Sequence, residues 1–97
     1  MEIIKWLSDP MSAYRGEAIV KLEPGETATM EDLLALIDGD SVGHFGLFIE
    51  LVSTEGTPEV YKDKRTGALK VRTQFGFPRA SELRKLPRFY RVTVLRD

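Results

Sequence analysis

The sequence contains no cysteine and a single histidine among its 97 residues. Without cysteine the chain has no disulfide framework, no thiolate metal site and no cysteine nucleophile. His44, in a glycine-flanked turn, is able to carry a proton. No serine, cysteine or second histidine forms a recognised catalytic pattern around it, which argues against nucleophilic catalysis. A chain without thiols suits a reducing compartment, so we expect a cytoplasmic protein.

Long apolar runs are also missing. No segment approaches the ~18 apolar residues that a membrane span requires, and residues 1–8 lack the basic leader of a signal peptide. We therefore expect a soluble, unprocessed protein with no membrane partner. The chain shows no repeat or linker, and its 42% hydrophobic content suffices for one core. These properties predict a single domain over residues 1–97.

Motifs for metals and cofactors are absent as well. Asp38 and Asp40 share a turn, but the other ligands of a calcium loop, including its terminal glutamate, are missing. Solvated turn carboxylates are the favoured interpretation. No metal set, nucleophile–base pair or phosphate-cradling glycine loop can be assembled. We predict a binding module without catalysis, cofactor or metal.

Charge, by contrast, is unevenly distributed. Residues 1–61 contain 3 basic and 12 acidic side chains, whereas residues 62–97 contain 11 basic and 3 acidic ones. The basic part favours an anionic partner, because clustered cations concentrate polyanions. Alternatively, acidic and basic elements lie side by side in the fold and neutralise each other.

Local patterns predict seven elements, with the hairpin at residues 60–75 counted as one. Short apolar strands are expected at residues 3–7 and 17–23, with Trp6 interpreted as a packing residue rather than a ligand platform. Thr29 caps a helix that ends at Gly39. The most apolar run, residues 45–52, is typical of a central strand. Residues 60–75 predict a hairpin, followed by a helix at 81–86 and a strand at 88–95. The expected core contains Leu33, Leu34, Ile37, Phe48, Val71 and Val92.

These elements predict an α+β fold with an antiparallel sheet of about five strands. Two short helices cover one face, and the order is ββαββαβ. Without the first strand, this is the ferredoxin-like, split-βαβ arrangement.

Residues 22–33 and the hairpin at 61–70 resemble corresponding segments of RNA-recognition motifs, a likeness that places residues 17–96 in that family's order. The resemblance implies RNA binding by exposed aromatics on the first and third strands of the domain. Here the corresponding positions are Ala18, Arg72 and Gln74, so affinity would rest on phosphate contacts. A degenerate domain used for protein contact stays open.

Residues 1–8, together with Tyr14, are similar to the start of a phage anti-CRISPR inhibitor of the type I-F surveillance complex. This resemblance implies that the protein binds another protein, without enzyme activity. Trp6 and Tyr14 would then lie where aromatic contacts are made.

We expect nucleic acid as the leading partner. A protein-binding inhibitor or adaptor is the alternative, and an enzyme ranks third. The predicted phosphate contacts are Lys62, Lys64, Arg65, Lys70, Arg72 and Arg91.

Overall fold

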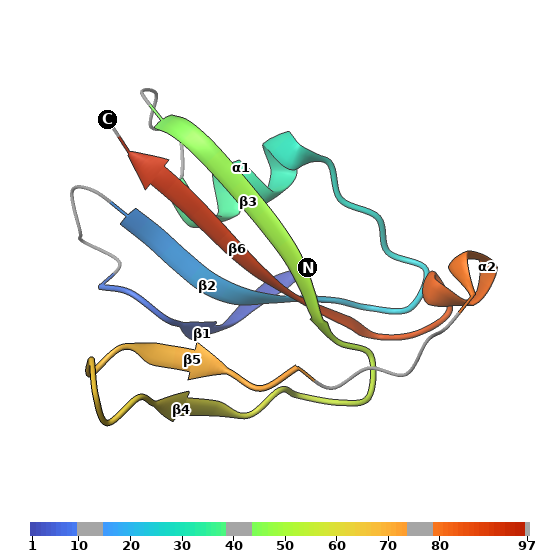
Figure 1. The fold of residues 1–97 in the computed structure, drawn as a ribbon. Coiled ribbons are helices and arrows are strands. Elements are labelled where there is room, and N and C mark those ends of the chain that lie inside the picture. The colour runs from blue at the N-terminus through green and yellow to red at the C-terminus, as the bar shows by residue number, and fades with distance from the viewer. Residues whose placement is uncertain (10–14, 39–43, 74–78, 97) are drawn as a thin grey trace.

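A computed structural model describes residues 1–9, 15–38, 44–73 and 79–96 (Figure 1). The fold is α+β, as predicted, but its element order is ββαβββαβ. The elements are β1 (Glu2–Trp6), β2 (Arg15–Leu22), α1 (Met30–Asp38), β3 (His44–Ser53), β4 (Val60–Lys62), β5 (Leu69–Val71), α2 (Ala80–Leu83) and β6 (Arg88–Arg96). Within the described ranges, neither helix is long and apolar enough to cross a membrane.

Four strands form the main sheet, in the order β1-β2-β6-β3. β6 lies between β2 and β3 and is antiparallel to both. β2 and β3 are therefore parallel to each other, and α1 connects them across one face of the sheet (Figure 1). This β2–α1–β3 unit is a split βαβ motif with β6 inserted.

The second half of the chain departs from the predicted ferredoxin-like order. β4 and β5 pair only with each other and form a separate two-stranded sheet, so the expected five-stranded sheet is wrong. The second predicted strand of this hairpin ends at Val71 rather than 75, and residues 74–78 lie outside the described ranges. α2 lies near the start of β6, beyond the end of the sheet, instead of covering a face (Figure 1).

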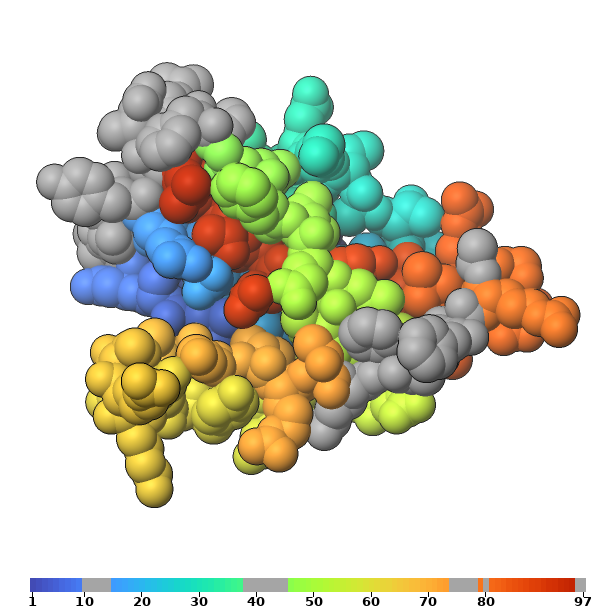
Figure 2. Space-filling model, in the orientation of Figure 1, coloured from blue at the N-terminus to red at the C-terminus, as the bar shows by residue number. Residues whose placement is uncertain are grey.

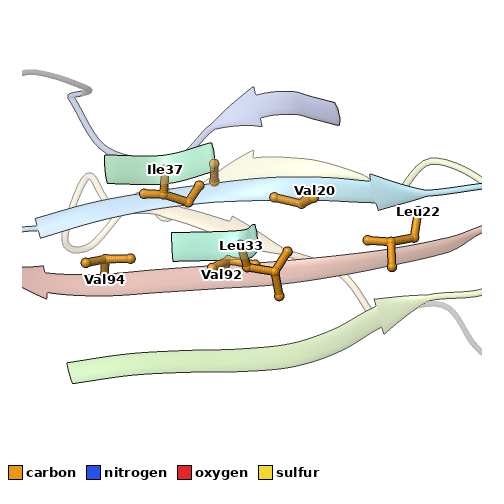
Figure 3. Packing of buried hydrophobic residues seen from close by; sticks show 7 residues of the cluster. Val20, Leu22, Leu33, Ile37, Val92 and Val94 are labelled. Atoms are coloured by element: carbon orange, nitrogen blue, oxygen red, sulfur yellow. The ribbon is translucent and has the colours of Figure 1, made fainter. Parts of the chain in front are cut away.

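The main sheet is packed on both faces because its central strands alternate between two apolar clusters. Ala18 and Val20 of β2 face α1, whereas Ile19 faces the β4–β5 hairpin. The α1 side contains Ala18, Val20, Leu22, Leu33, Ile37, Val92 and Val94 (Figure 3). The hairpin side contains Leu7, Ile19, Val52 and Phe89, with Val60, Leu69 and Val71 packed against them.

The predicted core is correct in part. Leu33, Ile37 and Val92 are buried together, and Leu34 packs half-buried against them. Val71 packs on the opposite face of the sheet. The burial predicted for Phe48 is wrong: its side chain is 59% exposed. β3 is an edge strand rather than a central one, so part of its length has no layer packed over it.

A reciprocal pair of hydrogen bonds starts α1. The Asp32 backbone N–H donates to Thr29 Oγ1 at 3.1 Å, and the Thr29 N–H donates to Asp32 Oδ2 at 2.9 Å. This capping box satisfies two backbone donors and confirms the predicted cap at Thr29. The expected end of the helix at Gly39 lies outside the described residues.

Candidate nucleic-acid interface

The β4–β5 hairpin carries most of the predicted phosphate contacts, and a tight turn shapes its tip. The Asp63 and Gly67 backbone N–H groups donate to Ala68 O and Asp63 O, each at 2.8 Å. Gly67 has a φ of +74°, a conformation that glycine adopts without a steric cost. Asp63 Oδ1 also accepts the Arg65 N–H at 2.8 Å, so local side-chain and backbone bonds order the turn.

Three of the six predicted contact residues are already paired with carboxylates. Lys70 Nζ lies 2.9 Å from Asp63 Oδ2, and Arg72 Nε lies 3.4 Å from Glu59 Oε2. Arg91 is not on the hairpin; its Nη2 donates to Glu50 Oε2 at 2.5 Å, across β6 and β3. These pairs favour the second interpretation of the charge asymmetry, in which acidic and basic segments neutralise each other locally.

The other three cations, Lys62, Lys64 and Arg65, have exposed side chains that form no ion pair with any described residue. Lys62 Cε lies 3.8 Å from the position that a Cβ would take at Gly67, so its side chain follows the turn. The hairpin forms a layer of its own beside the main sheet, with this turn at one end of the molecule (Figures 1 and 2). We call these three residues the basic tip.

The only carboxylate within the turn does not offset the basic tip. A hydrogen bond from Lys70, helped by the Arg65 backbone N–H, lowers the pKa of Asp63 below its ordinary value. The same contact raises the pKa of Lys70. Both groups are therefore charged at neutral pH, and the Asp63 charge is directed toward Lys70.

An exposed aromatic ring lies on the same hairpin, beside Arg72. Tyr61 of β4 is 40% exposed, and the Arg72 guanidinium carbon lies 5.4 Å from its ring centroid. We did not select Tyr61 from the sequence. The strand pattern does indicate its exposure: successive side chains of a strand point to opposite faces, so Tyr61 points outward where Val60 points inward. The sheet-face position expected for Ala18 is wrong, since Ala18 is fully buried under α1.

A groove of about 620 Å³ separates the hairpin from the uncovered part of the main sheet. Its lining mixes charges of both signs with apolar surface: Glu17, Phe48, Leu69, Lys70, Arg91 and Thr93. Glu17 is buried, and its Oε2 accepts hydrogen bonds from Arg15 Nη2 at 2.8 Å and Thr93 Oγ1 at 2.7 Å. The groove, which Arg15 also lines, therefore presents charges of both signs rather than a purely basic surface for a phosphate.

Of the two residues of the protein-binding alternative, the structure describes only Trp6. Trp6 is half-buried and packs against the α1-side cluster, in agreement with a packing role. Tyr14 lies outside the described residues. Among the described residues, no three histidine, aspartate or glutamate side chains gather as metal ligands.

No protein family, curated protein or solved structure matches this chain. The assignment of function therefore rests on the geometry of the hairpin and on the charges it carries.

Proposed function

We propose that the protein is a small non-enzymatic module of the cytoplasm that binds single-stranded nucleic acid through the basic tip. One observation carries the proposal: Lys62, at the end of β4, and Lys64 and Arg65, in the tight turn that follows, are exposed and have no carboxylate partners among the described residues. Exposed cations that have no ion-pair partner attract phosphates at a low desolvation cost. Each such contact releases counterions from the nucleic acid.

Tyr61 supplies the second part of the proposed interface. An exposed ring on the same hairpin as the basic tip offers a surface on which a base can stack, a contact that contributes ~1–3 kcal/mol per base. Arg72 already lies over one part of the ring, so a base would stack beside the guanidinium or replace it. Lys70, Arg72 and Arg91 take secondary roles, because phosphate must compete with Asp63, Glu59 and Glu50 for them.

The resemblance to an RNA-recognition motif supports this proposal through the hairpin alone. The first-strand position of that family's stacking surface corresponds to Ala18, which is buried under α1. We therefore place the interface on the hairpin and not on the main sheet.

The first test is the salt dependence of binding to a fluorescently labelled single-stranded oligonucleotide of about 12 nucleotides. Each neutralised phosphate contributes a slope of about −0.7 on a logarithmic salt scale for single strands. Three contacts predict a loss of affinity of about 20-fold between about 50 and 200 mM salt. Fluorescence anisotropy measures this directly. Binding that does not respond to salt would contradict the proposal and favour the protein-binding alternative.

Charge reversal locates the interface. Lys64→Glu and Arg65→Glu should each weaken oligonucleotide binding several-fold and flatten the salt dependence. Lys85→Glu is the matched control, because Lys85 is also exposed but follows α2, at the other end of the molecule from the basic tip (Figure 1). An equal loss in all three variants would indicate that only net charge matters, and that the basic tip is not the site.

A further inference from the structure

The main sheet ends at β3, whose outer edge pairs with no strand among the described residues. The pairing of β3 with β6 shifts between His44 and Gly46 and again between Leu51 and Ser53. Residues 46–51 therefore form a regular segment between two irregular ends. In this segment every second residue directs its backbone N–H and C=O groups away from β6. No other backbone–backbone hydrogen bond to residues 46–51 is formed within the described part of the chain.

Exposed apolar side chains gather at the same edge. Phe48 and Ile49, which is 37% exposed, are neighbours on β3 and face opposite sides of the sheet. Met30, in the first turn of α1, is 65% exposed and lines a groove of about 350 Å³ together with Ile49. Clustered apolar surface of this kind marks an interaction site.

The usual protection of edge strands is weak in this segment. Natural edges are shielded by charged side chains, by proline or by bulges. Residues 46–51 contain no proline and only one charged residue, Glu50. The charge of Glu50 is paired with Arg91 on β6, so it does not repel an approaching strand strongly.

We propose that β3 pairs with β3 of a second copy of this chain. The two strands run antiparallel around a two-fold axis that passes through Phe48, perpendicular to the sheet. The two four-stranded sheets then become one continuous sheet. This contact is isologous and closes as a dimer.

The strand's own sequence selects a second copy and this register. With the axis at Phe48, the two Phe48 rings face each other and Leu47 faces Ile49 of the copy, so apolar residues meet on both faces. Glu50 falls opposite glycine at position 46, which has no side chain to clash. An axis at Glu50 would place two carboxylates opposite each other, a destabilising arrangement. The net charge of −1 adds little repulsion between copies.

The groove beside Met30 agrees with the same register. Leu47 of the copy lies opposite Ile49, on the α1 side of the sheet, and so extends the apolar surface that Ile49 and Met30 begin. The dimer therefore covers Phe48 and Ile49 and continues the apolar surface to which Met30 belongs.

Sedimentation equilibrium over a roughly hundredfold range of protein concentration tests the dimer, because association follows mass action. The wild type should shift from 11.0 kDa toward about 22 kDa as concentration rises. Phe48→Lys should stay monomeric, since it places two ammonium groups opposite each other on the axis. Tyr61→Lys is the matched control, another exposed aromatic away from β3, and it should dimerise as the wild type does. A wild type that stays at 11.0 kDa throughout would overturn the proposal, as would a Phe48→Lys dimer.

The absence of native cysteine allows a test of register. Directly opposed residues of antiparallel strands have Cα atoms about 4.5–5.5 Å apart, within the range that a disulfide spans. Phe48→Cys should therefore form a covalent dimer rapidly with oxidised glutathione, and Tyr61→Cys should not. A mixture of Leu47→Cys and Ile49→Cys should cross-link more than either variant alone. Equal rates for Phe48→Cys and Tyr61→Cys would show that β3 does not meet its copy.

Discussion

The Glu17 carboxylate and the Thr93 hydroxyl lie directly opposite each other on β2 and β6, joined by a hydrogen bond of 2.7 Å. Both residues are buried at the base of the groove beneath the hairpin. Arg15 supplies a second donor to the same carboxylate oxygen. A buried charge is tolerated only when such partners replace the water it has lost.

Removal of the Thr93 hydroxyl should therefore destabilise the fold. Thr93→Val keeps the shape of the side chain but leaves the carboxylate with one fewer donor. Because hydrogen bonds to charged groups contribute about 1.5–3 kcal/mol, we expect the free energy of unfolding to fall by that amount. Urea denaturation measures the change. Thr93→Ser, which retains the hydroxyl donor, should lose much less stability. A larger loss in Thr93→Ser than in Thr93→Val would show that packing of the methyl group, and not the hydrogen bond, stabilises this position.

The exposure of Phe48 predicts a small effect of its removal on the stability of the monomer. Phe48→Ala should change the free energy of unfolding by about 0.5 kcal/mol or less, as is usual for surface positions. Leu33→Ala, in the α1-side cluster, should cost ~2–5 kcal/mol because it leaves a cavity. Both are compared by urea denaturation at a low protein concentration, so that self-association does not contribute. A loss at Phe48 as large as that at Leu33 would place its ring in the core.

The pair of Asp63 and Lys70 predicts a dependence of hairpin stability on pH. Because the pKa of Asp63 is lowered in the folded hairpin, its contribution is present above the ordinary aspartate pKa of about 3.9 and is lost as pH falls through the lowered value. Lys70→Met should raise the pKa of Asp63 toward the ordinary range. NMR titration of the Asp63 carboxyl carbon measures this. Lys64→Met, at an exposed neighbour without an ion pair to any described residue, is the control and should shift the pKa less.

Local patterns predicted the elements whose partners lie nearby in the sequence. The cap at Thr29 and the apolar strand at residues 17–23 depend on neighbouring residues, so both are predicted from the sequence. The ion pair of Lys70 with Asp63 also lies within the hairpin. The register of β4 with β5 is enough to predict this ion pair. The sequence prediction took Lys70 as a phosphate contact because it considered this side chain without its neighbour across the hairpin.

The errors concern contacts between distant segments. An apolar run such as residues 45–52 is typical of a central strand, but β3 is at an edge because β6 takes the central position. The burial predicted for Phe48 is therefore wrong because the position of β3 in the sheet depends on β6, which is distant in the sequence. Glu50 and Arg91 are opposite each other only because β3 pairs with β6, and no local pattern links them.

The position of β6 also predicts an order of folding. β6 follows every other strand in the sequence, yet it separates β2 from β3, which do not pair with each other. The β1–β2 and β4–β5 hairpins close short loops and are able to form early. The sheet itself must wait for β6, because loop-closure entropy is lost before such distant pairings repay it. During synthesis, a chain that ends before Arg88 lacks β6. Such a chain would contain two hairpins and a helix but no complete sheet on which they could pack.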